Sequence, residues 1–150
     1  MDLKKLMVDT KSVWVDFPGL SGFSIEVVNL SRKELNGLRK RCTGQKFDRK
    51  TRAVVETLDE DKFVKEFSLS TIKNWKGLTL EHLETLILID TSGQDMKKEL
   101  DFTEENAETL VASSTEFDTW LNEVVFDLDN FRAEPKNRDN STTRQDVQES

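Results

Sequence analysis

The chain has 150 residues, of which 35% are hydrophobic and 34% are charged, and its formal net charge is −7. This length suits one domain with a single hydrophobic core, and the composition is too apolar for a wholly disordered protein. Cys42 is the only cysteine, and neither a signal peptide nor a run of about 18 apolar residues is present. We therefore expect a cytoplasmic protein without disulfides or membrane spans.

The first predicted element is a β-hairpin over residues 12–30. Hydrophobic residues alternate along both halves, and Pro18-Gly19 and Ser21-Gly22 supply turn chemistry between them. Trp14 and Val28 fall on the face opposite to the other alternating hydrophobic residues. If that other face packs on helices, Trp14 and Val28 remain as a candidate partner-binding patch.

A basic segment follows the hairpin. Residues 31–34 (Ser-Arg-Lys-Glu) match a capping box and predict the start of a helix, which Gly44 is placed to end. Residues 45–57 have no clear period, so we expect a basic loop that leads into a short strand at 53–55.

Two helices are predicted in the middle of the chain. Asp59 is the expected N-cap of the first, whose apolar stripe continues to Gly77 and comprises Val64, Phe67, Thr71 and Trp75. Thr79 starts the second, and its end at 86–89 is apolar all round, which predicts a deep position in the core. A turn at 90–93 and a short strand at 100–102 follow.

Two more helices are predicted in the acidic region. Thr103 is the expected cap of the first, and residues 113–116 give a second capping-box match. The last helix has an apolar stripe that comprises Phe117, Trp120, Leu121, Val124, Leu128 and Phe131. Val125 and Phe126 fall on its other face, where we expect them to be exposed and to bind a partner.

Residues 132–150 contain only Ala133 and Val147 as apolar residues other than proline. Such a segment cannot offset its ordering entropy by burial, so a disordered tail is expected. The prediction is an α+β fold, mainly helical with about five helices and an N-terminal β-hairpin. It occupies residues 12–131 as a single globular domain, after a flexible N-terminus at 1–11.

Opposite charges are concentrated in two regions. Residues 32–52 hold nine Lys or Arg against two acidic residues, whereas residues 99–131 hold ten Asp or Glu and no Lys or Arg. Complementary fields steer assembly, so the two regions are expected to meet within one molecule or head-to-tail between copies. Two independently solvated faces are the alternative. The residues assigned to charge-mediated self-association are Arg39, Lys40, Arg41, Arg49, Lys50, Glu104, Glu105 and Glu108.

Residues suited to catalysis are sparse. His82 is the only histidine and is expected on the surface, while Cys42 is expected to be a small buried hydrophobe. Zinc-ligand spacing, a Gly-rich phosphate loop and a nucleophile elbow are all missing. We predict no enzyme activity, cofactor or metal site. Nucleic acid is not an expected partner, because the basic block has only Phe47 as an interleaved aromatic and the acidic remainder repels a polyanion.

Trp75-Lys76-Gly77-Leu78-Thr79 and Phe102-Thr103-Glu104-Glu105-Asn106-Ala107 are the most distinctive stretches of the chain. With residues 72–74, which precede the first of them, and with further stretches at 13–28, 30–35, 58–63 and 117–121, they resemble the tail assembly chaperones of long-tailed, non-contractile bacteriophages. The similarity spans residues 12–131.

The resemblance implies a non-enzymatic morphogenesis factor in the cytoplasm of the infected host cell, absent from the mature virion. Such a factor binds the tape measure protein and recruits tail tube subunits to it, and we expect a homo-oligomer. The alternative from another functional class is an acidic inhibitor that mimics DNA and occupies a nucleic-acid-handling enzyme through residues 99–131.

Overall fold

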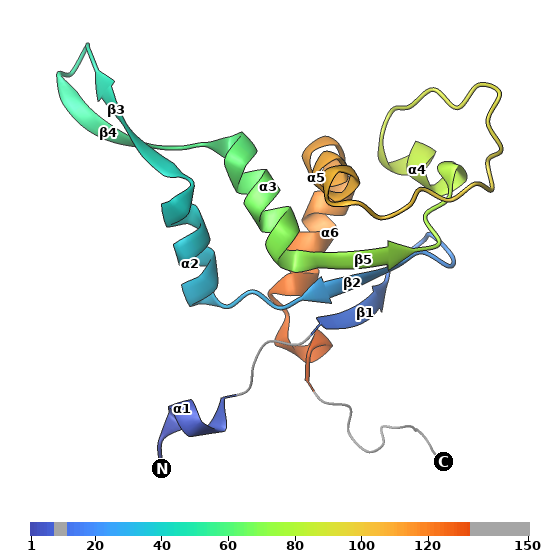
Figure 1. The fold of residues 1–150 in the computed structure, drawn as a ribbon, viewed down its shortest axis with the longest axis horizontal. Helices are drawn as coiled ribbons and strands as arrows, with labels where there is room; N and C mark the ends of the chain where they lie inside the picture. Colours follow the sequence, from blue (N-terminus) through green and yellow to red (C-terminus); the bar gives the residue numbers. More distant parts are fainter. Residues whose placement is uncertain (8–11, 133–150) are drawn as a thin grey trace.

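The structure is a computed structural model that describes residues 1–7 and 12–132 (Figure 1). Over these residues it contains six α-helices, five β-strands and one 3-10 helix, so the α+β prediction is confirmed. Within the N-terminus predicted to be flexible, α1 (Leu3–Leu6) forms a short helix with no buried residue. The predicted tail lies outside the described residues from 133 onward.

The centre of the fold is an antiparallel sheet with strand order β1-β2-β5. Strands β1 (Ser12–Asp16) and β2 (Ser24–Val28) form the predicted hairpin, and β5 (Ile72–Lys76) pairs with the other edge of β2. Hydrophobic residues at alternate positions of β1 and β2 lie on one face of this sheet and pack into the core. Helix α6 (Thr115–Val125) covers that face, because its Phe117 and Trp120 contact the ring of Phe17, the residue that follows β1.

Strand β5 corrects the prediction that one helix runs to Gly77. Helix α3 (Glu60–Thr71) starts after its N-cap Asp59 as predicted but ends at Thr71. The register of β5 against β2 shifts by one residue, as in a β-bulge, so Ile72 and Trp75 are both buried although they lie three positions apart. Two buried residues three positions apart are also what a helical stripe shows, so the sequence pattern wrongly predicted that the helix continued to Gly77.

The basic segment also differs from the prediction. Helix α2 (Arg32–Arg41) has the predicted capping box, but it ends at Arg41 and not at Gly44. Strands β3 (Thr43–Asp48) and β4 (Ala53–Leu58) then form a two-stranded antiparallel hairpin in place of the expected basic loop. The short strand predicted at 53–55 is confirmed as part of β4.

Helices α4 (Leu80–Leu86), α5 (Glu104–Ser113) and α6 (Thr115–Val125) start near the predicted caps. Ser114, not Ser113, caps α6, because α5 ends and α6 begins at this single buried residue. A 3-10 helix, η1 (Leu128–Asn130), follows α6, so Leu128 leaves the predicted stripe and is exposed.

Two expectations between α4 and α5 are wrong. After α4 the backbone becomes extended at Ile87, so successive side chains point to opposite sides and Leu88 is fully exposed instead of buried. Residues 100–102 form no strand; pairing at this point is limited to a bridge between Thr79 and Glu99. The predicted turn at 90–93 is present, with Gly93 at a positive φ.

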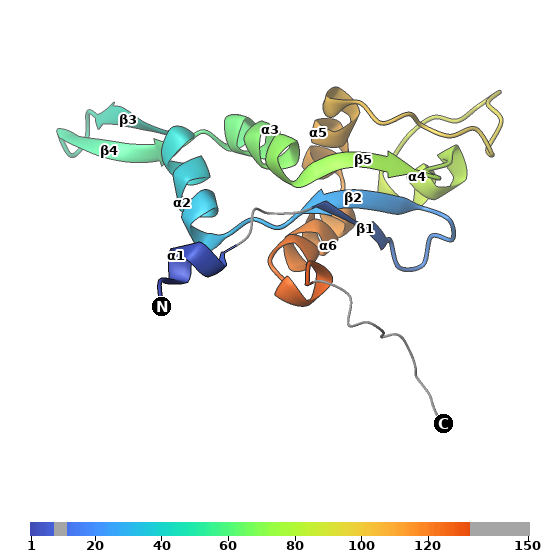
Figure 2. The same ribbon diagram turned by 60° about the horizontal axis from the view of Figure 1, so that its bottom comes forward.

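Figures 1 and 2 show how these elements are arranged. The sheet and helices α3, α5 and α6 form the body of the molecule, and α3 packs extensively on α5. Helix α4 and the loop that follows it lie at one end of the body. The β3–β4 hairpin extends beyond α2 and α3 at the other end.

Candidate interaction surfaces

The outer face of the sheet carries the predicted patch of Trp14 and Val28. Trp14 lies opposite Glu26 in the register and is 45% exposed, while Val28 is half-buried. The Lys76 ammonium lies 4.8 Å from the centroid of the Trp14 ring, which is a cation–π geometry. The patch is therefore accessible, with a basic group beside its aromatic ring.

The prediction that Val125 is exposed is wrong. Val125 has no exposed surface, because the segment that joins β2 to α2 crosses the end of α6. The backbone amide of Leu30 and the side-chain amide of Asn29 both donate to the Val125 carbonyl, at 3.2 and 2.7 Å. Phe126 is 39% exposed, as predicted, and its ring also contacts Phe67 of α3.

The most exposed apolar surface on a β-structure belongs to residues 43–58, which we call the arm. Phe47 and Val54 face each other across the β3–β4 ladder and are 59% and 61% exposed, and Val55 is exposed on the other face. Arg49 and Lys50, at the turn of the arm, were predicted to take part in self-association, but its apolar residues were not among the predicted partner-binding residues. The only sequence signal for this apolar surface is the run at 53–55, since β3 has Phe47 as its single large apolar residue.

The base of the arm is fixed to the body, whereas its strands are not covered. Cys42 is buried at the C-cap of α2, and its carbonyl accepts a 2.8 Å hydrogen bond from the amide of Asp59. An isolated two-stranded hairpin is marginally stable in water. An arm with exposed residues on both faces therefore gains most from a partner that covers it.

The tip of the arm is basic and hollowed. Lys46, Arg49 and Lys50 line a hollow of about 460 Å³ together with Phe47 and Val55. Arg52 closes the turn with a positive φ of 58°, and its amide donates to the Asp48 carbonyl at 2.7 Å. The tip thus combines apolar surface with cationic groups.

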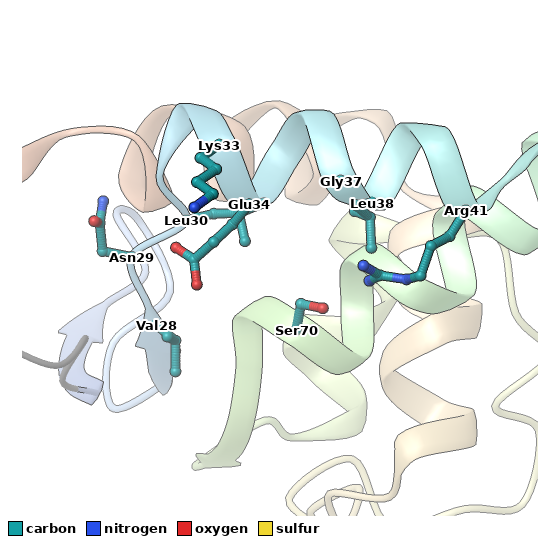
Figure 3. A pocket seen from close by; sticks show the side chains of 9 residues that line it. All are labelled: Val28, Asn29, Leu30, Lys33, Glu34, Gly37, Leu38, Arg41 and Ser70. Atoms are coloured by element: carbon teal, nitrogen blue, oxygen red, sulfur yellow. The ribbon is translucent and has the colours of Figure 1, made fainter.

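A second hollow, of about 600 Å³, lies between α2, the end of α3 and the last residue of β2 (Figure 3). Val28, Leu30 and Leu38 supply its apolar lining. Charged side chains also line it: Glu34 and Arg41, two helical turns apart on α2, both extend to the side of α2 on which Ser70 lies. Val28 therefore belongs both to the outer sheet face and to this pocket.

The basic and acidic regions do not pair within the described part of the chain. The salt bridges there join Arg41 to Glu66 of α3, at 3.7 Å, and Arg132 to Asp129, at 2.8 Å. Helix α3 lies between α2 and α5. The expected contact within one molecule is therefore not formed, and contact between copies remains a prediction.

One carboxyl group of the acidic region is perturbed. Burial raises the pKa of Asp118 above its ordinary value, and a hydrogen bond from the Asn122 side chain opposes this rise. Glu104 and Glu105 are exposed on α5, and Glu108 is half-buried. Most of the acidic surface is therefore exposed to solvent.

His82 and Cys42 have structural surroundings. His82 is half-buried as the third residue of α4; its Nδ1 lies 3.0 Å from the Gly77 carbonyl, and its ring stacks on Phe23. The expected surface position is therefore only partly correct. Cys42 is buried as predicted. Among residues 1–7 and 12–132, no cluster of three or more His, Cys, Asp or Glu is placed to hold a metal ion.

The distinctive stretches at 75–79 and 102–107 set turns and caps. Trp75 is buried and donates its indole N–H to the Leu100 carbonyl at 2.9 Å. Gly77 has a φ of 76° and packs directly against Gly22 of the β1–β2 turn. Thr79 and Thr103 cap α4 and α5. These residues hold the scaffold and leave other surfaces for binding.

No protein-family model, curated protein or solved structure matches the chain. Within the residues that the structure describes, none of the helices has the length and hydrophobicity required to cross a bilayer. The surfaces of the molecule and the resemblance in sequence are therefore the guides to its function.

Proposed function

We propose that the chain is a non-catalytic tail assembly chaperone that binds the tape measure protein of a long-tailed phage, recruits tail tube subunits and self-associates. It would act in the cytoplasm of the infected host cell and be absent from the mature virion. The proposal combines the resemblance of residues 12–131 with the exposed surfaces described above.

The observation that carries the proposal is the uncovered arm. Phe47, Val54 and Val55 expose large apolar surface on a hairpin that nothing in the described chain covers. Large exposed apolar groups rimmed by charge are typical of protein-binding surfaces. A chaperone of a long helical protein needs such surfaces at several places, and Trp14 and Phe126 supply two more.

Co-expression with a fragment of the tape measure protein tests this function. We expect the full chain to keep the fragment soluble and to co-purify with it at physiological salt. The variant Phe47→Ser/Val54→Ser should lose most of this effect. Leu88→Ser should not, because this fully exposed leucine belongs to the loop after α4, and that loop lies at the end of the body opposite the arm. Precipitation of the fragment with and without the wild-type chain would contradict the proposal.

An acidic inhibitor is the second candidate, and the unpaired acidic surface of α5 and α6 favours it. Ten acidic residues occupy 99–131, and among those described only Asp129 takes part in a salt bridge. Such a surface would bind the basic cleft of a DNA-handling enzyme in a strongly salt-dependent way. Inhibition of such an enzyme at low salt, without any effect on a tape measure fragment, would favour this candidate.

A further inference from the structure

We infer that the tip of the arm docks on the C-terminal end of α6 in a second copy of the chain, so that copies join head-to-tail. The inference rests on the self-association included in the proposed function and does not depend on the tape measure protein. It names both halves of the interface, whereas the charge pattern in the sequence identified only two oppositely charged regions.

The first half is the tip of the arm. Phe47 and Val54 form an exposed apolar pair on one face of the hairpin. Phe47 also lines the hollow at the tip together with Lys46, Arg49 and Lys50, where Asp48 is the one acidic lining residue. Two strands of six residues reach about 20 Å, which carries the tip clear of α2 and α3 in both ribbon views. The tip is therefore presented to other molecules and not to its own body.

The second half is the end of α6, which we call the α6 patch (residues 123–129). Phe126 and Leu128 are 39% and 57% exposed there. Glu123 and Asp127 lie beside them in the sequence, are exposed, and form no salt bridge within residues 1–7 and 12–132. The patch thus carries two exposed large apolar side chains, as the arm does at Phe47 and Val54, and has the opposite charge.

The acidic residues of α5 provide a weaker match. No large apolar side chain of α5 is exposed, so Glu104 and Glu105 offer charge without a surface for Phe47 to cover. Burial of apolar area contributes most of the stability of an interface, while charge steers and aligns it. The α6 patch therefore fits the tip better than α5 does.

The two halves differ, so the contact is heterologous. A copy that uses its arm still has a free α6 patch, and the series closes into a ring or continues as an open chain. We expect the mass measured by size-exclusion chromatography with light scattering to rise past that of a dimer as concentration increases. High salt should weaken the assembly, because the rim charges are exposed.

Charge reversal tests the pairing in the full chain. The arm variant Lys46→Glu/Arg49→Glu/Lys50→Glu and the patch variant Glu123→Lys/Asp127→Lys should each raise the apparent dissociation constant by at least about tenfold. An equimolar mixture of the two should associate again, because each variant supplies the intact half that the other lacks. Circular dichroism and thermal unfolding confirm that both variants are folded.

Glu104→Lys/Glu105→Lys is the matched control, since it makes the same charge change on α5, and it should leave association unchanged. If this control weakens association as much as the patch variant does, or if mixing restores nothing, the inference is wrong. Loss of the oligomer on nuclease treatment would show instead that the arm binds nucleic acid. A wild-type chain that stays monomeric would overturn the inference and the self-association, while tape measure binding would still be decided by the co-expression experiment.

Discussion

Replacing Gly77 by alanine tests whether the contact between two turns fixes the end of the sheet. Gly77 follows β5 with a φ of 76°, and Gly22 belongs to the turn between β1 and β2. A Cβ atom on residue 77 would overlap the Gly22 carbonyl oxygen and lie 2.8 Å from its carbonyl carbon. Both neighbours are backbone atoms, so the clash cannot be relieved by a side-chain rotation.

Two effects contribute to the loss of stability expected for Gly77→Ala. The left-handed conformation costs an alanine about 1 kcal/mol, which the lower entropy of the unfolded alanine chain partly offsets. Separation of the two turns adds a cost of the kind seen on overpacking, about 1–3 kcal/mol. We expect the free energy of unfolding to fall by about 3 kcal/mol in total, which corresponds to a decrease in Tm of about 10 °C for a domain of this size.

Urea unfolding followed by circular dichroism measures this loss, and Gly93→Ala is the matched control. Gly93 has the same φ of 76°, but a Cβ there meets no atom within 4 Å. The control therefore isolates the conformational cost, and its loss should stay below about 1 kcal/mol. Equal losses for the two variants would show that the contact with Gly22 contributes nothing.

Three other substitutions test features of the same scaffold. Ser114→Ala removes a buried cap whose hydroxyl accepts from the Phe117 amide at 3.1 Å. It should lower the free energy of unfolding, measured in urea, by about 1–2 kcal/mol. Thr103→Ala, at an exposed cap, should lower it by less. Trp75→Phe leaves the Leu100 carbonyl without its indole donor and should cost about 2 kcal/mol, measured in the same way. Asp118→Asn tests the raised pKa of that carboxyl. Because the folded state holds this proton more tightly than the unfolded state, the contribution of Asp118 to stability falls as the pH rises through the ordinary carboxyl range toward the raised pKa. The wild type should lose stability relative to the variant as the pH rises through the ordinary carboxyl range and just above it, and parallel pH profiles would contradict the assignment.

Local features of the fold were predictable from the sequence. The caps at Ser31, Asp59, Thr79 and Thr103 are all present. A cap depends on a hydrogen bond between a side chain and an amide three residues away, so its signal is complete within a few positions. The β1–β2 hairpin was predictable for the same reason, because its alternating hydrophobic residues and its turn residues lie close together in the chain.

Features that depend on distant contacts were not predictable. Strand β5 exists because the edge of β2 is available to it, and the bulge opposite Glu26 and Val27 gave its buried residues a helical spacing. Val125 is buried because Asn29 and Leu30, almost a hundred positions earlier, bind its carbonyl. In each case the structure depends on a contact with residues that are distant in sequence. The pattern of hydrophobic residues within a short stretch of the chain carries no information about such a contact.

The candidate interface and the resemblance to phage chaperones depend on different residues. One resembling stretch ends at residue 35 and the next begins at residue 58, so almost the whole arm lies between them. The α6 patch begins after residue 121, where the last resembling stretch ends. The stretches at 75–79 and 102–107 instead contain the turn at Gly77 and the caps at Thr79 and Thr103. The resemblance therefore supports the kind of scaffold, whereas the identity of the contact residues depends on the exposed apolar side chains of the arm and the α6 patch and on the opposite charges beside them. For this reason the charge-reversal experiment can fail while the chaperone function stands, and the tape measure experiment can fail while the arm still joins one copy to the next.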